Sequence, residues 1–493
     1  MIYNFNLGIG WASSGVEYAQ IYRARMFRNI GVDAKFVFTD MFPSENMEHM
    51  TKNIGFLDSE VIWLYTFFID FKTAPVTYTL SDLEKTFSNM EYTKSREGKI
   101  CRYVFGGSNN FYTAYMVNDH DDFVHRVEMV SNGFLIRKDY FTYGRVYSEY
   151  YAPLDNKAHL YHRRFFNENG SVAYEEIIDD DRVMYKFKDK ILCSKEEFVG
   201  YMVSQLHLTK DDVVLIDRST DIGQSILMNC KPARVGTVVH ADHFSEKDTN
   251  DDYILWNNYY EYEFNMHKHI DFYICSTQAQ SDLMVQQFEK YYGVTPCVYT
   301  IPVGSLPELK YPSSTRKPYS LITASRLASE KHVDWICKAV IQARSEVPEV
   351  SLDIYGVGGE REKLETIIRD NNASDYIHLM GQHDLSEVYQ NYEAYIAGST
   401  SEGFGLTLME AVGGGLPIIG FDVRYGNPTF IRNGENGYLI SLPEEDKERI
   451  EALRKGIVDL FKQDLEKCHS VSYEVAKDFL TCNVQEKWRE AVC

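Results

Sequence analysis

Two glutamates, Glu402 and Glu410, bracket a glycine-rich turn within residues 399–420. Residues 395–397, just before the turn, are typical of the end of a buried strand. Residues 406–412, just after it, predict a short helix that a run of glycines stops. The segment therefore predicts a strand, a ligand-facing loop and a helix in immediate succession.

This turn places a helix N-terminus at the carboxyl end of a strand, where open α/β sheets bind ligands. We expect the backbone amides of Gly405, Leu406 and Thr407 to bind an anion there, because the helix dipole favours negative charge. Two carboxylates beside such a site suit a ligand with both phosphate and hydroxyl groups, and a nucleotide sugar has both. For the glutamate spacing alone, the alternative is an ordinary strand–loop–helix with two solvated side chains.

Two cations, Arg326 and Lys331, follow a predicted strand over residues 320–324. They lie on a strand-to-helix turn, at a spacing that brings both charges to one side. A diphosphate leaving group needs such neutralisation. The alternative is a pair of surface cations with partners elsewhere.

A glycine-rich turn also follows the first predicted strand, residues 3–7, and precedes a helix predicted over residues 16–30. Its glycines at positions 8, 10 and 15 let the backbone approach a ligand, and a serine is placed to cap the helix. The pattern is a weak dinucleotide-binding fingerprint, so a tight turn with no further role is the alternative.

One histidine, His240, ends a strand predicted over residues 236–240. Its imidazole is suited to donate to a hydroxyl group or to stabilise developing positive charge. A core or capping histidine is the alternative, and His243 is the residue that would take its place.

Length and composition limit the kinds of protein that this chain can be. At 493 residues the chain is long enough for two or three domains, and 44% hydrophobic with 25% charged residues is ordinary for a globular protein. A net charge of −21 argues against nonspecific binding to nucleic acids or anionic membranes. Nine scattered cysteines without a C-x-x-C pair favour reduced thiols over disulfides or a zinc site.

The first residues lack a basic region followed by an apolar core, so we expect no signal peptide. No apolar run approaches ~18 residues, so we expect no transmembrane helix. A cytoplasmic location follows from these expectations.

Strand–helix alternation divides the chain into an α/β architecture. Residues 1–50 and 195–304 predict the two parts of one Rossmann-like domain, and residues 305–493 a second one. Residues 51–194 instead show aromatic, alternating segments with Asn-Gly turns, which predict an inserted antiparallel β-sheet domain. Further helices are predicted over residues 253–265 and 385–392, and a C-terminal helix that crosses back to the first domain.

Two stretches together resemble the signature of retaining glycosyltransferases of family 4. They are residues 399–420, with Gly-Phe-Gly-Leu-Thr and Gly-Gly-Gly-Leu-Pro-Ile-Ile-Gly, and residues 324–331, Ala-Ser-Arg-Leu-Ala-Ser-Glu-Lys. The resemblance implies the GT-B fold, in which two Rossmann-like domains face each other. It implies a UDP-sugar as substrate, retention of configuration, and neither metal nor other cofactor.

The resemblance also assigns roles to residues of this sequence. It makes His240 and Glu402 catalytic, with sugar contacts from Glu402, Phe404 and Gly405, and gives Glu410 to the nucleotide ribose. The donor diphosphate would be bound by Arg326, Lys331, Gly15, Gly405, Leu406 and Thr407. The acceptor side would be formed by Ser14, Val16, Glu17 and His243.

Within that family, residues 4–19, the inserted sheet, and residues 239–246 and 253–260 resemble one subfamily. It is the A-type protein O-glycosyltransferase of bacterial accessory secretion, which starts O-glycosylation of serine-rich repeat adhesins in the cytoplasm. The resemblance implies transfer of GlcNAc from UDP-GlcNAc, or of glucose from UDP-glucose, to Ser or Thr hydroxyls.

The same resemblance implies a homologous, non-catalytic B-type subunit as partner, a homo-oligomer, or both. The inserted sheet would engage the polypeptide acceptor and the partner, and an exposed aromatic sheet offers an extended chain a surface for strand addition. We expect no nucleic-acid partner and at most peripheral association with the inner face of the membrane.

Two alternative functions remain open at this point. A non-catalytic subunit is disfavoured because Arg326, Lys331, Glu402 and Glu410 are all present. A family 4 transferase acting on a lipid or polysaccharide is disfavoured because a small acceptor needs no extended sheet.

Overall fold

The computed structural model describes residues 1–9, 15–43, 45–88, 90–107 and 109–493. The chain forms two compact units. Unit 1 comprises Met1–Ala24, Val32–Thr237 and Asn258–Asp271, and unit 2 comprises Arg25–Gly31, Val238–Asn257 and Phe272–Cys493. We describe each unit by itself.

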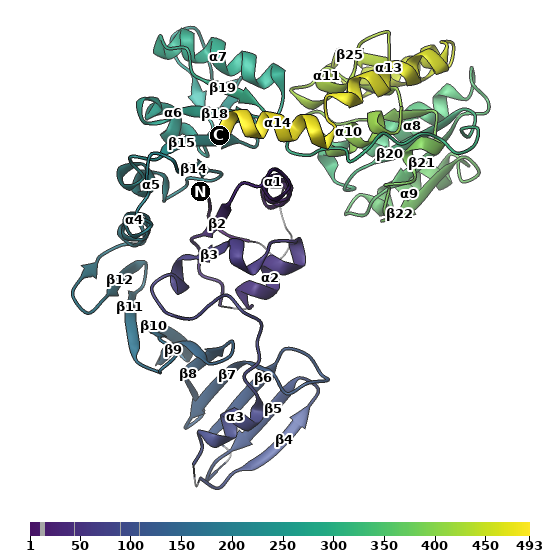
Figure 1. Ribbon diagram of the computed structural model, residues 1–493. Helices are drawn as coiled ribbons and strands as arrows, with labels where there is room; N and C mark the ends of the chain where they lie inside the picture. Colours follow the sequence, from purple (N-terminus) through teal and green to yellow (C-terminus); the bar gives the residue numbers. More distant parts are fainter. Residues whose placement is uncertain (10–14, 44, 89, 108) are drawn as a thin grey trace. The chain divides into compact units, whose positions relative to one another are not determined.

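Unit 1 contains a parallel sheet whose strands follow the order β3-β2-β1-β14-β15 (Figure 1). These strands are β1 (Ile2–Asn6), β2 (Ala34–Phe38), β3 (Val61–Trp63), β14 (Val213–Ile216) and β15 (Arg234–Val239), the last of which ends in unit 2. The helices are α1 (Gly15–Ile30), which also ends in unit 2, α2 (Met47–Ile54), α4 (Lys195–Gln205), α5 (Gly223–Asn229) and α6 (Glu261–Asn265), with short 3₁₀ turns η1 (Asp58–Glu60), η2 (Leu64–Thr66) and η3 (His267–His269). Near-continuous apolar strands such as Val213–Ile216 are typical of a parallel sheet covered on both faces.

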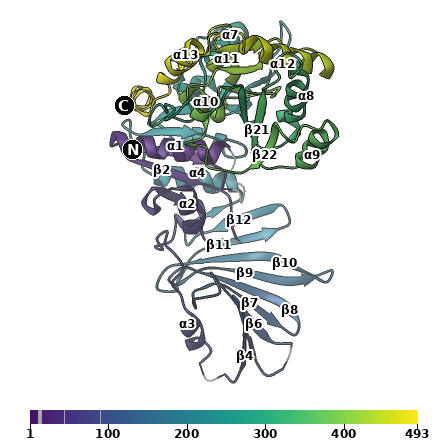
Figure 2. The ribbon, with the colours of Figure 1, turned by 90° about the vertical axis from the view of Figure 1, so that its right-hand side faces the viewer.

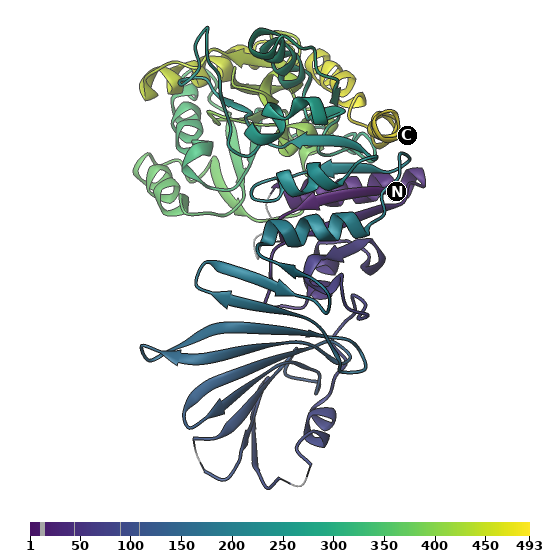
Figure 3. The ribbon, with the colours of Figure 1, turned by 90° about the vertical axis from the view of Figure 1, so that its left-hand side faces the viewer.

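The second sheet of unit 1 has ten antiparallel strands in simple sequence order, and the two side views show them as a broad curved fan (Figures 2 and 3). They are β4 (Thr93–Glu97), β5 (Ile100–Val104), β6 (Phe111–Met116), β7 (Val124–Ser131), β8 (Phe134–Phe141), β9 (Arg145–Leu154), β10 (Lys157–Phe166), β11 (Val172–Asp179), β12 (Arg182–Lys186) and β13 (Ile191–Leu192). The predicted antiparallel sheet is confirmed, and β3 continues the parallel sheet past residue 50.

Aromatic rings join the antiparallel sheet to the parallel-sheet part of unit 1. Phe165 and Tyr174 stack with ring centroids 4.4 Å apart, and Tyr185 stacks on Phe198 of α4 at 4.1 Å. The Tyr174 hydroxyl donates to Tyr65 O at 2.7 Å, so this buried phenol has its partner. On other strands, a second core packs Leu80 and Leu83 of α3 (Leu80–Lys85) against β5, β6 and β7.

Unit 2 contains a six-stranded parallel sheet in the order β22-β21-β20-β23-β24-β25. Its strands are β20 (Ser320–Ala324), β21 (Ser351–Tyr355), β22 (Ile377–Gly381), β23 (Ala394–Ile396), β24 (Ile418–Phe421) and β25 (Gly437–Ile440). The helices are α7 (Gln278–Tyr292), α8 (Val333–Ala343), α9 (Arg361–Asp370), α10 (Leu406–Gly413), α11 (Gly426–Phe430), α12 (Asp446–Leu460), α13 (Leu465–Lys477) and α14 (Thr481–Val492), with 3₁₀ turns η4 (Ser329–Lys331) and η5 (Tyr389–Asn391). β18 (Phe272–Cys275) and β19 (Val298–Thr300) form a parallel pair, and β16 (Phe244–Ser245) and β17 (Leu255–Trp256) a hairpin.

The C-terminal helix α14 packs against β19 and against the end of α1, both within unit 2. The Trp488 ring meets Phe27 edge-to-face, with centroids 5.3 Å apart. Chain segments from opposite ends of the sequence therefore share this core. Over the stretches that the structure describes, we find no helix with both the length and the apolar character needed to cross a bilayer.

Two predicted helices are wrong. Residues 253–265 contain strand β17 and only the five-residue helix α6, because Asn250 forms a side-chain turn with the amides of Asp252 and Tyr253 that starts the returning strand. Residues 385–392 contain only the 3₁₀ turn η5. A 3₁₀ turn places residues three apart on one side, which puts Tyr389 and Tyr392 into the same core.

Candidate active site

The predicted strand, loop and helix around the two glutamates are confirmed as β23, a loop and α10. Gly405 caps α10 with φ of +90°, and an added Cβ would lie 2.6 Å from Leu408 Cδ1, so the position requires glycine. Within the described part of the chain, the backbone amides of Gly405, Leu406 and Thr407 donate no hydrogen bond. They form the anion-binding cluster that the sequence predicts.

Glu402 is paired with Lys331 in this structure. The Lys331 Nζ lies 2.6 Å from Glu402 Oε2, and each side chain is about one-fifth exposed (21% and 20%). The Glu402 backbone is held by residues after β24: its N–H donates to Arg424 O at 3.2 Å, and its carbonyl accepts from the amides of Tyr425 and Gly426 at 2.6 and 2.7 Å. A fixed backbone with a paired, accessible carboxylate results.

Lys331 itself lies against the end of β23. A Cβ added to Gly398 would stand 3.0 Å from Lys331 O, so only glycine lets the two loops approach this closely. Arg326 is 74% exposed and pairs with Glu330 at 2.9 Å rather than joining the Lys331–Glu402 pair. Arg326 and Lys331, the two cations predicted to bind the diphosphate, thus come from one turn but have separate partners.

Glu410 is the fifth residue of α10 and is partly buried. The Tyr389 hydroxyl donates to Glu410 Oε2 at 3.0 Å. Burial raises the pKa of the Glu410 carboxyl, and the hydrogen bond from Tyr389 opposes that shift. This leaves a carboxylate with one oxygen oriented by a buried phenol.

A second buried phenol, Tyr395, joins the two loops. Its hydroxyl donates to Ala324 O at 2.9 Å, accepts from Ala324 N at 3.3 Å and lies 3.1 Å from Thr407 Oγ1. Neither Tyr389 nor Tyr395 was among the predicted site residues. The signal that would have found Tyr395 is a tyrosine inside an otherwise apolar strand, because a buried hydroxyl needs a hydrogen-bond partner.

The two histidines differ in their surroundings. His240 follows β15, and its carbonyl oxygen lies 3.8 Å from the position of a Cβ added to Gly403, so it is beside the Glu402 loop. His243 is fully buried, with Nε2 2.7 Å from Gln287 Oε1 and Nδ1 3.3 Å from the Tyr425 hydroxyl. Burial lowers the pKa of His243 to about 4, so the ring is neutral. We therefore give His243 a structural role in place of the predicted acceptor contact.

The contact of Phe404 with the sugar stays a prediction, and burial of the ring limits it to the Phe404 backbone. Its ring is buried and packs edge-to-face on Phe430 and Phe479, at 5.3 and 6.0 Å between centroids. Only the Phe404 backbone is left for a ligand, because the ring anchors the loop in the core.

Val16 and Glu17, two of the predicted acceptor-side residues, lie in the first turn of α1, in unit 1, next to Gly15, which is predicted to bind the donor diphosphate. Gly15 is exposed, whereas Val16 and Glu17 are buried at 7% and 3% exposure. Ser14 lies outside the described residues. Burial leaves the backbone of this first turn, rather than the Val16 and Glu17 side chains, as the accessible surface.

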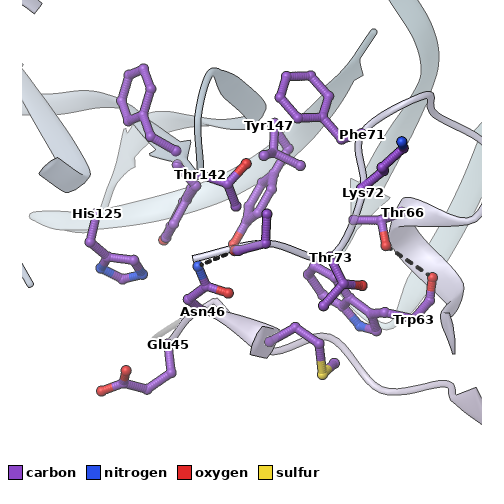
Figure 4. A pocket seen from close by; sticks show the side chains of 15 residues that line it. Glu45, Asn46, Trp63, Thr66, Phe71, Lys72, Thr73, His125, Thr142 and Tyr147 are labelled. Atoms are coloured by element: carbon purple, nitrogen blue, oxygen red, sulfur yellow. Dashed lines mark hydrogen bonds between the residues drawn. The ribbon is translucent and has the colours of Figure 1, made fainter. Parts of the chain in front are cut away.

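A separate pocket lies in unit 1, between the parallel-sheet part and the antiparallel sheet (Figure 4). Its lining is mainly apolar, from Trp63, Phe71, Tyr140 and Tyr147 among others, and none of the predicted site residues belongs to it. Among residues with a described placement, His, Cys, Asp and Glu side chains nowhere gather in a group of three or more that would hold a metal ion. Independence of metals stays a prediction.

Comparison with known proteins gives two family matches. Residues 93–189 match the GtfA extended beta-sheet domain, and residues 310–478 match glycosyl transferases group 1. The first match lies within β4–β12, and the second contains Lys331, Glu402 and Glu410. The two sites of sequence resemblance thus fall in separate parts of the fold.

The similarity to individual relatives extends over the full length. The chain is 52% identical to the UDP-N-acetylglucosamine–peptide N-acetylglucosaminyltransferase GtfA subunit of Streptococcus agalactiae, over 99% of this chain and 97% of the relative. It superposes on a chain of a GtfA/B complex with a TM-score of 0.96 at 51% identity, covering 100% and 99% of the two chains. It superposes on the pneumococcal O-GlcNAc transferase GtfA, solved with UDP and GlcNAc, with a TM-score of 0.86 at 49% identity, covering 100% and 98%. The predicted GT-B fold is confirmed, and the chain belongs to the GtfA-subunit family of peptide N-acetylglucosaminyltransferases.

Proposed function

We propose that this protein transfers GlcNAc from UDP-GlcNAc to Ser and Thr hydroxyls of a polypeptide, with retention of configuration. The observation that carries the proposal is the constellation at the start of α10. It combines the amide cluster of residues 405–407, the Lys331 ammonium and the Glu402 carboxylate, in a chain half identical to relatives named for this activity. Amides and a cation suit a diphosphate, and a carboxylate suits sugar hydroxyls.

In this proposal the UDP diphosphate binds the α10 N-terminus and the cations of the preceding turn. Lys331 and Arg326 neutralise the charge that develops when the bond between C1 of the sugar and the phosphate oxygen breaks. Glu402, released from Lys331, accepts hydrogen bonds from the sugar, and Glu410 accepts from the ribose hydroxyls. The backbone of His240 lies beside the Glu402 loop, and the family resemblance gives its imidazole to the reacting carbon.

The acceptor hydroxyl then forms its bond to C1 on the face that the phosphate leaves. Its proton passes to the departing phosphate oxygen, so the products are the glycosylated side chain and UDP. No step requires a metal ion, because the helix N-terminus and the two cations supply the positive charge. These roles rest on the site geometry together with the family resemblance.

We further propose a serine-rich repeat adhesin as the acceptor, glycosylated in the cytoplasm as the first step of its modification. The edge strand β4 is exposed along its entire length, and no other strand in the described part of the chain pairs with its outer side, which suits addition of an extended chain. A homologous B-type subunit is the proposed partner, supported by the similarity to a chain of a GtfA/B complex. Any membrane association would be peripheral.

The test is the intact mass of a recombinant Ser/Thr-rich repeat after incubation with the protein and either UDP-GlcNAc or UDP-glucose, with and without the partner subunit. An increment of one or more N-acetylhexosamines is the expected result. A hexose increment would reassign the donor. If no donor gives an increment even with the partner, while UDP-GlcNAc is consumed with a lipid or polysaccharide acceptor, the polypeptide assignment is overturned.

A further inference from the structure

One phenolic hydroxyl, that of Tyr395, connects the ends of two neighbouring strands and the start of a helix. Tyr395 lies on β23 and is only 3% exposed. It contacts both backbone polar groups of Ala324, the last residue of β20, and the hydroxyl of Thr407, the second residue of α10. Ala324 precedes the turn of Arg326 and Lys331, so the phenol lies between the cation turn and the amide cluster.

The Tyr395 hydroxyl has a limited hydrogen-bonding capacity, with one proton to donate and two lone pairs to accept. If its proton goes to Ala324 O, the phenol oxygen accepts from Ala324 N and from Thr407 Oγ1, and all its capacity is used. Burial raises the pKa of Tyr395 to about 12, so the proton stays on the phenol at physiological pH. A phenylalanine would fill the same space and leave Ala324 O and the Thr407 hydroxyl without this partner.

Other contacts hold the two loops elsewhere. Ser325 N donates to Tyr355 O, and Leu327 N to Val357 O, so the cation turn is held from the β21 side. The Lys331–Glu402 pair joins the cation turn to the loop that precedes α10. Among the described residues, Gly405 gives α10 no side-chain cap, and the Tyr395 hydroxyl joins the start of α10 to the end of β20, the strand that leads to Arg326.

We propose that Tyr395 is a positioning residue for the donor diphosphate, holding the α10 amide cluster and the cation turn at the separation that one diphosphate spans. The inference rests on the proposed function, because it assigns the diphosphate to this pair of loops. Tyr395 does not touch the ligand itself: it acts through Ala324 and Thr407. Its loss should weaken recognition of the β-phosphate more than recognition of uridine and the ribose.

The test measures dissociation constants of UDP and UMP for the full-length protein by calorimetry, without acceptor or partner. The ratio Kd(UMP)/Kd(UDP) isolates the β-phosphate. In Tyr395→Phe we expect this ratio to fall about tenfold, which corresponds to about 1.4 kcal/mol. Thr407→Val should reproduce the fall, Thr407→Ser should keep the wild-type ratio, and the Tyr395→Phe/Thr407→Val double variant should add little to either single change.

The matched control is Tyr392→Phe. Tyr392 is similarly buried at 7% exposure, but its hydroxyl donates to Asp353 at 2.6 Å instead of to either loop. It should lose stability without a change in the ratio. A ratio in Tyr395→Phe equal to that of Tyr392→Phe, with melting lowered in both, would overturn the positioning role and leave a purely structural one. If wild-type protein binds neither nucleotide, the proposed function fails, and the inference with it.

Discussion

The Lys331 ammonium lies 2.6 Å from the Glu402 carboxylate, although the two residues come from different strand ends, after β20 and after β23. Both side chains remain partly accessible, so the pair is not a core salt bridge. A diphosphate arriving at the α10 N-terminus would compete with Glu402 for this cation. In the proposed mechanism, the cation that holds the Glu402 carboxylate is therefore the one that the donor diphosphate would bind.

This competition predicts that Glu402→Gln separates binding from transfer. Sugar transfer should be lost, because the amide cannot act as a carboxylate toward the sugar. UDP should bind about fivefold more tightly, roughly 1 kcal/mol, because Lys331 is released from its partner. Calorimetry with UDP measures the binding effect, and the acceptor mass assay measures the transfer effect. The melting temperature should be unchanged, which shows that the variant is folded.

Glu387→Gln is the control, since it removes a carboxylate from Lys310 Nζ at the same 2.6 Å separation, away from the start of α10. That variant should change neither property. Near wild-type transfer in Glu402→Gln would contradict the catalytic assignment. Weaker UDP binding would contradict the competition.

Glu410 predicts a pH dependence of donor binding. Burial raises the pKa of its carboxyl, so as pH falls Glu410 protonates earlier than an exposed glutamate would, and it then offers one acceptor fewer to the ribose. UDP affinity of the wild type should decline as pH falls through this raised pKa. Glu410→Gln should bind UDP about tenfold more weakly at neutral pH and lack this part of the decline.

Titration of the UDP phosphate contributes to both proteins equally, so the difference between their affinity profiles reports Glu410. The two profiles would run parallel at all pH values if the residue had no contact with the nucleotide.

Much of this site could be predicted because strand ends, glycines and charges lie close together in the sequence. β23, the loop and α10 form one continuous segment, and its local patterns suffice to place Glu402 and Gly405. The partners of those residues come from distant segments. The hydrogen bond from Tyr389 to Glu410 depends on a 3₁₀ turn where helical periodicity predicts an α-helix.

Burial is the other property that the sequence did not reveal. Phe404 and His243 lie in motifs whose family resemblance implies ligand contacts, but their rings are buried in the core. The range of the antiparallel sheet was also harder to place than its existence, because the short strand β3 pairs in parallel with β2 through contacts that alternation does not report.

The Arg23–Asp217 pair predicts a large effect on stability. Both side chains are at most 2% exposed and are joined by two hydrogen bonds, at 2.7 and 2.9 Å. Arg23→Met removes both guanidinium hydrogen bonds from a buried carboxylate, which should cost about 3–5 kcal/mol of unfolding free energy. Denaturant unfolding of the full-length protein, followed by far-ultraviolet circular dichroism, measures this cost.

Lys85→Met is the comparison, because it breaks an exposed pair with Asp82 and should lower the unfolding free energy far less than Arg23→Met does. Equal losses in the two variants would show that burial of the Arg23–Asp217 pair has no energetic consequence.

We expect ionisation of the Glu263 carboxyl to make the unfolding free energy depend on pH. Its carboxyl is fully buried, accepts from Ser219 Oγ at 2.8 Å, and has its pKa raised by burial from 4.5 to about 7. A group that holds its proton more tightly when folded contributes stability that is complete below the unfolded pKa and is lost as pH rises through the folded pKa. The unfolding free energy of the wild type should therefore fall between about pH 4.5 and 7, by about 3 kcal/mol from this group. Glu263→Gln stays neutral and should lack this component, so its melting temperature relative to wild type should rise across that interval. Glu261→Gln, at an exposed neighbouring position, should follow the wild-type profile, and the same profile for Glu263→Gln would mean that Glu263 is ionised in the folded protein throughout.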